Sequence, residues 1–420
     1  MDLAQLSRHE LDNGLRITLL PDDSLSLVAV NLWYHVGSKN ERPRLTGFAH
    51  LFEHMLFQGS QNVSSNGHFE HVQRVGGVAN GSTWYDRTNY YETLPSSALE
   101  TGLWLESDRM GFLLPAMTSE KLENQRSVVM NERRQRVDNQ PYGQASERLS
   151  ELLYPADHPY HWPVIGYMED IEAATLEDVT TFFETFYTPN NAALTLVGDF
   201  DPVHALERIR AYFGDIPRGP EIEPVQPGLP PARLSREVLE DQVQLPRIYL
   251  AYALDSFGTD EWYAANLLSQ VLSQGRSSRL HHSLVYEQQL AQSASTFVSP
   301  TEACATFTLA ATAKPEISAE EIEEAVVQEL RRVIEDGVDE AELDRARNGL
   351  LLGHHGQLQS RERVADMLSA MVTYFDDPSR YAEATERYGA VTTDDVSDLA
   401  RGRLDPDGGA RVLVVPEAAA

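Results

Sequence analysis

Two histidines and a glutamate lie within one stretch of five residues that could bind and use a metal ion. His50 and His54 are four residues apart, so on a helix their side chains lie one above the other on one face. Zinc in a hydrolytic site takes three protein ligands and leaves one position open for water, toward which Glu53 could act as general base. The alternative is an amphipathic helix with two surface histidines and a solvated glutamate, which this pattern alone does not exclude.

The apolar residues around this motif favour the metal site. Leu51, Phe52, Met55 and Leu56 alternate with the polar residues in a helix that we expect at about 44–57, stopped by a glycine. Such a helix faces a core. The two histidines are therefore expected in a partly buried position.

A third ligand has to come from another part of the chain. Leu122 and Val129 are seven residues apart in a helix expected at 120–137. Glu132 follows an apolar turn of this helix and could point into the core, where a carboxylate needs a cation. It could also be a solvated glutamate paired with Arg136. The residues alone leave both interpretations open.

Several ordered motifs together resemble those of one enzyme family. The run HLFEHMLFQGS, preceded by Gly47, resembles the inverted zinc-binding motif of the pitrilysin and mitochondrial-processing-peptidase family, the inverzincins. The stretches that also fit are GGVANGST at 76–83, HPY at 158–160, VIG at 164–166 and YTPNN at 187–191. The resemblance covers essentially the whole chain and is stronger in residues 1–216 than in 234–420.

This resemblance implies a zinc peptidase with one Zn²⁺ per chain. His50, His54 and Glu132 would be the metal ligands. Glu53 would accept a proton from the attacking water while zinc polarises the scissile carbonyl. Gln125 stands where the family usually has a second glutamate, and an amide can still hydrogen-bond there but adds no negative charge near the metal.

The resemblance also implies how a peptide substrate binds, namely as an extended strand added to the edge of a sheet. The edge strand corresponds to Ala79, Asn80, Gly81, Ser82 and Thr83. Gly81 takes the place of a residue that is commonly alanine in the family. The alternative is an edge hairpin without a binding role.

The second half lacks two side chains that active single-chain members of the family use. In those members an arginine and a tyrosine bind the substrate backbone, whereas the corresponding residues here are Val285 and Gln292. Tyr286 or Arg279 could substitute. We expect instead a homologous partner subunit that lacks HxxEH, supplies the pair and encloses a chamber with this chain. A homodimer, a solitary chain and a non-catalytic assembly subunit are the alternatives.

The organisation of the chain is predicted from a linker and an internal repeat. The proline-rich stretch 217–233 is expected to join a zinc-binding domain at 1–216 to a homologous domain at 234–420. A shift of 216 residues lays 48–59 over 264–275, where apolar residues coincide but His50, Glu53 and His54 fall on Asn266, Ser269 and Gln270. We predict an α+β fold with two structurally similar domains, each a mostly antiparallel β-sheet flanked by α-helices, of which only the first binds metal.

Individual elements are predicted from periodicity. An opening hairpin is expected from the alternating stretches 15–19 and 28–34. Further helices are expected at about 97–113, 176–185, 262–272, 319–336 and 340–349, and further strands at 192–196, 248–254 and 412–415.

The composition excludes several classes of partner. A formal net charge of −30 argues against nucleic acid and anionic membranes, which repel an acidic surface. The single cysteine excludes an intramolecular disulfide. No signal peptide and no long apolar run are visible, so we expect no membrane span and a cytoplasmic protein.

Overall fold

The computed structural model describes residues 1–417 and contains two compact units. Unit 1 comprises Met1–Asn131, Pro163–Val225 and His355–Glu383, and unit 2 comprises Glu132–Trp162, Gln226–His354 and the chain from Ala384 on. The units therefore differ from the continuous halves expected from the linker. Each unit includes a segment from the other half of the chain. The sequence does not predict this exchange, because it does not show on which sheet a helix will pack.

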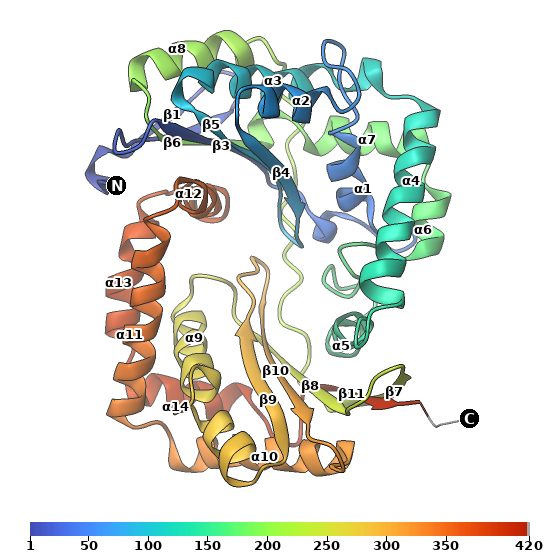
Figure 1. The fold of residues 1–420 in the computed structure, drawn as a ribbon, viewed down its shortest axis with the longest axis vertical. Coiled ribbons are helices and arrows are strands. Elements are labelled where there is room, and N and C mark those ends of the chain that lie inside the picture. The colour runs from blue at the N-terminus through green and yellow to red at the C-terminus, as the bar shows by residue number, and fades with distance from the viewer. Residues whose placement is uncertain (418–420) are drawn as a thin grey trace. The chain divides into compact units, whose positions relative to one another are not determined.

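Unit 1 is built on a six-stranded mixed sheet (Figure 1). Its strands are β1 (Ser7–Glu10), β2 (Arg16–Pro21), β3 (Leu27–Tyr34), β4 (Val78–Thr83), β5 (Thr88–Pro95) and β6 (Ala192–Gly198). They lie in the order β1-β2-β6-β3-β5-β4, and only β2 and β6 are parallel. β4 is therefore an edge strand whose partner in the sheet is β5.

The predicted hairpin of 15–19 with 28–34 is wrong. β6 lies between β2 and β3, and β2 instead forms a hairpin with β1 around the Asn13–Gly14 turn. The physical reason is burial. Every residue of β6 is buried, which suits a strand in the middle of a sheet that is covered on both faces.

Helices cover both faces of this sheet. The helices of unit 1 are α1 (Phe48–Met55), α2 (Gly67–Arg74), α3 (Leu99–Phe112), α4 (Ser119–Arg133), α6 (Met168–Ala173), α7 (Leu176–Phe186), α8 (Pro202–Phe213) and α12 (Arg361–Phe375). Figure 1 shows α3 and α8 on one face and α12 on the other. Successive β3 side chains serve the two faces, since Leu32 belongs to the main core whereas Trp33 packs with Ala370 of α12.

Polar contacts also attach α12 to its face of the sheet. Trp33 Nε1 and Asn89 Nδ2 both donate to Asp366 Oδ1, at 3.0 and 3.2 Å. Ser369 Oγ donates to Thr195 Oγ1 at 2.8 Å. A helix from the last quarter of the chain thus completes a sheet made by the first half.

Unit 2 repeats the topology of unit 1. Its strands are β7 (Ser235–Asp241), β8 (Arg247–Leu254), β9 (Ala291–Val298), β10 (Ala305–Ala313) and β11 (Ala410–Pro416). Their order β7-β11-β8-β10-β9 matches β2-β6-β3-β5-β4, with the one parallel pair, β7 and β11, at the same place. The predicted pair of similar α+β domains is confirmed, and the repeat explains why the apolar residues of the two halves coincide.

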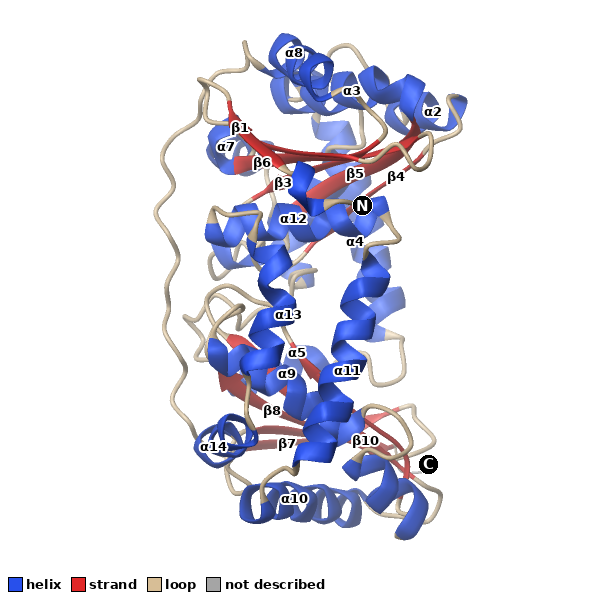
Figure 2. Ribbon diagram, turned by 90° about the vertical axis from the view of Figure 1, so that its left-hand side faces the viewer, coloured by secondary structure: helices blue, strands red, loops and turns tan. Residues whose placement is uncertain are grey.

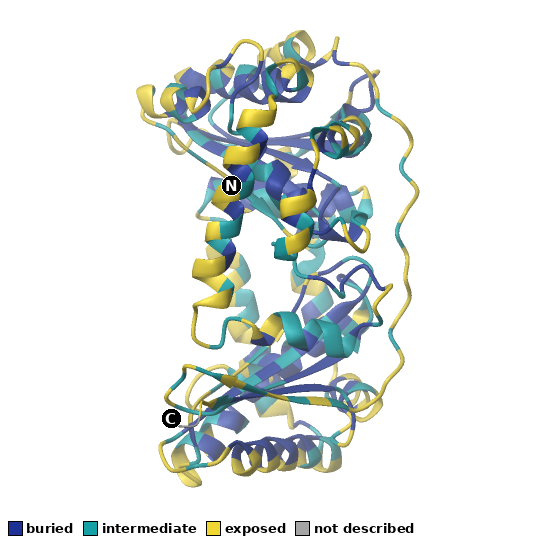
Figure 3. Ribbon diagram, turned by 90° about the vertical axis from the view of Figure 1, so that its right-hand side faces the viewer, coloured by how far each residue is buried: buried dark blue, intermediate teal, exposed yellow. Residues whose placement is uncertain are grey.

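The helices of unit 2 also cover two faces of a sheet. They are α5 (Ala145–Leu153), α9 (Asp260–Ser273), α10 (Ala319–Asp336) and α14 (Thr393–Arg403), while α11 (Glu340–Gln357) and α13 (Arg380–Ala390) cross the boundary between the units. α5 comes from the first half of the chain and packs through Ala145 and Leu149 against Val412 of β11. Buried residues, dark blue in Figure 3, concentrate in the sheets and the helix faces that contact them.

Residues 217–234, which include the predicted linker, contain no helix or strand and join α8 to β7 (Figure 2). The predicted helices and strands of both halves are present, with ends within a few residues of those expected except for α11, which is longer, and α1, which begins at Phe48. Among the residues described, no helix is both long and apolar enough to cross a membrane.

Candidate metal centre

The helix α1 holds the HxxEH motif at the surface of the unit 1 core. Its apolar residues Phe48, Leu51, Phe52 and Met55 are buried, and the Phe52 ring stacks on Tyr187 with centroids 4.9 Å apart. The motif residues themselves are half-buried. The core thus fixes the back of the helix and leaves its functional face accessible.

Two glycines of the family motifs set the start of this helix. Gly47, the N-cap, has φ +82°, and Gly166 has φ +78°. A Cβ on Gly166 would lie 2.4 Å from Gly47 Cα, and one on Gly47 would lie 2.7 Å from Ile165 O. Larger residues would separate the two backbones. The 164–166 stretch therefore helps to position the N-terminus of α1.

Glu41 caps the same helix and was not found from the sequence. Its carboxylate accepts hydrogen bonds from the Gly47 and Ala49 N–H groups at 2.9 and 2.8 Å, where the helix N-terminus otherwise has unpaired donors. Burial raises the pKa of Glu41, and these N–H groups oppose that rise. No spacing rule predicts a cap from a loop several residues away, so no signal was available.

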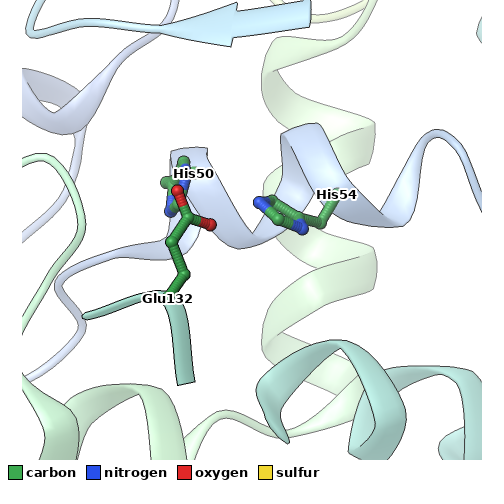
Figure 4. A group of neighbouring side chains, drawn as sticks. All are labelled: His50, His54 and Glu132. Carbon is green, nitrogen blue, oxygen red and sulfur yellow. The ribbon is translucent and has the colours of Figure 1, made fainter. Parts of the chain in front are cut away.

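The structure brings the three predicted metal ligands together (Figure 4). One nitrogen of each of His50 and His54 and one oxygen of Glu132 all lie within 4.8 Å of one another. The two imidazole centroids are 4.8 Å apart. Two imidazoles and one carboxylate form a donor set that zinc takes in hydrolytic sites. The residues therefore fit the metal that the sequence predicts.

Glu132 lies in the last turn of α4, and the boundary between the units falls just before it. The predicted apolar stripe is present, because Leu122, Gln125 and Val129 are buried on this helix. Gln125, two turns before Glu132, is 5% exposed. The position expected to influence the metal ligands is thus on the inner face of α4.

Glu132 also makes the ion pair proposed as the alternative. Arg136 Nη1 lies 2.7 Å from Glu132 Oε1, and the Arg136 side chain is 75% exposed. An exposed pair of this spacing contributes about 0.3–0.5 kcal/mol. Binding of a structural zinc contributes on the order of 10 kcal/mol. The ion pair is therefore no obstacle to ligation.

The predicted substrate strand lies directly against the predicted base. Ala79 to Thr83 fall within β4, the edge strand, and Thr83 Oγ1 donates to Glu53 Oε2 at 2.7 Å. A Cβ on Gly81 would lie 3.2 Å from Glu53 Cγ and 3.1 Å from Phe57 Cε2. The glycine that departs from the family pattern thus leaves space beside the base.

A second group of possible ligands consists of His68 of α2, Glu92 of β5 and Glu106 of α3, all buried. The guanidinium of Arg109 already provides a positive charge for the two carboxyl groups of this cluster. Its Nε donates to Glu106 Oε2 at 2.9 Å, and its Nη2 donates to Glu92 Oε1 at 3.4 Å. His68 Nε2 lies 2.8 Å from the same Glu92 oxygen. We name His68, Glu92, Glu106 and Arg109 the buried ion network. Its hydrogen bonds and ion pairs indicate a structural role rather than a metal site.

Burial sets the protonation of this network. Desolvation, reinforced by Arg109, lowers the pKa of His68 to about 3, so the imidazole is neutral. Desolvation raises the pKa of Glu106 to about 8 despite Arg109, and the nearby Glu92 carboxyl adds to the rise. Glu106 is thus protonated at neutral pH.

The protonated Glu106 predicts a loss of stability at alkaline pH. A pKa raised above its unfolded value of 4.5 stabilises the fold at low pH, and this stability is lost as pH rises through about 8. His68 weakly opposes this slope near pH 6.5, where its unfolded form is half protonated, and contributes almost none above about pH 7.5. We expect the melting temperature of the chelator-treated protein to fall between pH 6.5 and 8.5, and to fall less in Glu106→Gln.

The control for this experiment is Glu100→Gln on the same helix, because Glu100 is half-exposed and pairs with Arg208 at the surface. Scanning calorimetry of the three proteins across the pH range makes the measurement. Equal slopes for wild type and Glu106→Gln would contradict a proton bound by the buried ion network.

The positions of the missing arginine and tyrosine both lie in unit 2. Val285 is half-buried at 281–287, and Gln292 is exposed on β9. Of the two proposed substitutes, Arg279 is already bound to Glu342 at 2.6 and 2.7 Å and to Gly337 O at 2.7 Å. Tyr286 is 72% exposed. The structure thus weakens the case for Arg279 as a substrate-binding residue.

Two family models match the chain. Residues 17–158 match Insulinase (Peptidase family M16), and residues 173–350 match the Peptidase M16 inactive domain. The first match contains the three candidate ligands and Glu53. The second begins within the predicted first domain and extends over residues 234–350 of the predicted second domain, where the sequence predicts no metal site.

Curated relatives and solved structures agree with these matches. Zinc protease PqqE of Helicobacter pylori is 31% identical over 376 residues, which are 87% of this chain and 83% of PqqE. The uncharacterized zinc protease YmxG of Bacillus subtilis is 24% identical over 81% of this chain and 82% of its own. A solved protease from Helicobacter pylori superposes with a TM-score of 0.91 at 28% identity, covering 98% of this chain and 99% of that one.

Less similar structures share the fold alone. The first half of the periplasmic protease PqqL of Escherichia coli superposes with a TM-score of 0.77 at 21% identity, covering 98% of this chain and 92% of that one. Taken with the paired sheets and the motif residues, the two family models and the likeness to PqqE show that this chain belongs to peptidase family M16, the pitrilysin family.

Proposed function

We propose that this chain is a zinc metalloendopeptidase that hydrolyses peptides or unfolded segments. The observation that carries the proposal is the convergence of His50, His54 and Glu132, with Glu53 beside them and against the edge strand β4. The likeness to a named zinc protease supports the choice of metal and of reaction.

Each of these groups has a distinct chemical role. The two histidines and Glu132 would hold the zinc ion, which would act as a Lewis acid and lower the pKa of water. Glu53 accepts the proton of the attacking water and returns it to the leaving amine. The free backbone edge of β4 pairs with an extended peptide and brings its scissile bond to the base.

The competing function is a non-catalytic assembly subunit of the same family. It predicts loss of the metal ligands or of the base, and all four are in place in this chain. Metal content and metal dependence separate the two functions.

Removal of the metal is expected to abolish hydrolysis. Elemental analysis of the purified chain should give one zinc per molecule. Treatment with 1,10-phenanthroline should remove the zinc and reduce cleavage of a quenched fluorescent peptide library by at least about 100-fold, and added Zn²⁺ should restore it. The isomer 1,7-phenanthroline, which cannot chelate, is the control. A chain that binds no zinc after reconstitution would contradict the proposal.

We further propose that a homologous subunit without HxxEH supplies the substrate-binding arginine and tyrosine. Val285 and Gln292 cannot do this work, and Arg279 is held by Glu342. The zinc-loaded chain should cleave the peptide library at least about tenfold faster when mixed with its candidate partner than alone. Equal rates would show that the chain acts without such a partner.

A further inference from the structure

The hydroxyl group of Thr83 links the edge strand to the predicted base. Thr83 Oγ1 lies 2.7 Å from Glu53 Oε2 and 3.5 Å from the carbonyl oxygen of Ala49, one helical turn earlier. A hydroxyl has one proton to donate, and the shorter distance assigns it to the carboxylate. One oxygen of Glu53 is therefore held by a donor from outside its helix.

We propose that Thr83 is a positioning residue that fixes the orientation of the Glu53 carboxylate. This inference rests on the proposed peptidase function. The terminal torsion of a glutamate side chain is broad, so the carboxylate plane needs a partner to define it. The hydrogen bond from Thr83 to Oε2 supplies such a partner.

The backbone around Thr83 makes it a rigid donor. Thr83 pairs with Thr88 at the end of the β4–β5 hairpin, and Thr88 Oγ1 is itself bonded to Val36 O at 2.9 Å. Its branched Cβ restricts the side-chain torsion further. β4 is also the proposed substrate strand. The same element would therefore determine the position of the bound peptide and the orientation of the Glu53 carboxylate.

Unit 2 contains a related contact without a catalytic group. Thr296 of the equivalent edge strand β9 donates to Ser269 O at 2.9 Å and lies 2.8 Å from Ser273 Oγ, both on α9. Ser269 corresponds to Glu53 at the shift of 216 residues. A hydroxyl from the edge strand can therefore also serve to attach the strand to its helix. A test has to separate this structural role from positioning of the base.

The first experiment compares Thr83→Val, which keeps the shape and removes the hydroxyl, with Thr83→Ser, which keeps the hydroxyl. With the zinc-loaded full chain and its partner where needed, we expect Thr83→Val to lower kcat about 10- to 100-fold with KM and zinc content changed less than about twofold. Thr83→Ser should stay within about threefold of wild type. Thr296→Val, the same change at the contact in unit 2, should leave kcat unchanged.

The second experiment needs no activity. Crystal structures of wild type and Thr83→Val should show the Glu53 carboxylate rotated in the variant while His50 and His54 superpose. Superposed carboxylates, or a Thr83→Val variant in which only KM rises, would overturn the positioning role. If the wild-type chain proves inactive, the peptidase proposal fails, and the crystallographic comparison still decides whether Thr83 holds Glu53.

Discussion

Replacing Glu53 by glutamine is expected to abolish peptide hydrolysis while the chain keeps its zinc. An amide cannot accept a proton, and loss of a general base lowers kcat by about 10²- to 10⁴-fold. The fold should be unaffected, because glutamine has the same size and its oxygen can still accept the Thr83 hydroxyl. The rate of cleavage of the peptide library and the zinc content of each protein are the measurements.

Glu132→Gln provides the matched comparison, since it is the same chemical change at the third ligand. It should lower zinc content, because a neutral amide is a weaker ligand than a carboxylate. The two variants therefore predict opposite outcomes for metal content and the same outcome for activity. Wild-type turnover by Glu53→Gln would remove the proposed role of Glu53, and loss of zinc from that variant would make Glu53 a ligand.

Replacing Arg109 by methionine is expected to destabilise unit 1 strongly. The substitution leaves the Glu92 and Glu106 carboxyls buried without their cation, a change that costs about 3–5 kcal/mol when one partner of a buried pair is removed. It also removes the guanidinium from the face of Tyr90, whose centroid is 4.1 Å away. The shift of the first thermal transition in calorimetry is the measurement.

Arg208→Met is the control for this prediction. Arg208 of α8 pairs at the surface with Glu100 of α3, the helix that also carries Arg109, and both side chains of this pair are about half exposed. It should cost less than about 1 kcal/mol. A second substitution, Glu92→Gln, should recover part of the loss in the Arg109→Met background. Equal effects of the two arginine variants would show that the buried ion network contributes no more than a surface pair.

The sequence predicted most of the elements around the site because their patterns are local. The i, i+4 histidines and the stripe of Leu122 and Val129 each follow from helix periodicity within a few turns. The grouping of His50, His54 and Glu132 was predicted from the family resemblance. Helix periodicity alone did not decide whether Glu132 is a metal ligand or a solvated surface residue. The three side chains lie together in the structure, and their role as ligands and the bound metal stay predictions.

Other features depend on contacts between distant residues and left no local signal. The insertion of β6 between β2 and β3 pairs residues more than 150 positions apart, so two adjacent alternating stretches resembled a hairpin. The buried ion network escaped detection because Glu106 and Arg109 have the types and spacing of a surface ion pair. Their burial depends on α2 and β5 packing around α3.

The placement of α12 on the first sheet has a consequence for how the chain is made. The last strand of that sheet ends at Gly198, but the helix that covers its second face ends at Phe375. At about 5–20 residues per second, the roughly 180 residues between them take on the order of 10–40 s to synthesise. Throughout that time the nascent chain exposes the face around Trp33 and Ala193. Synthesis of α12, rather than completion of the metal-binding segment, thus sets when unit 1 can close.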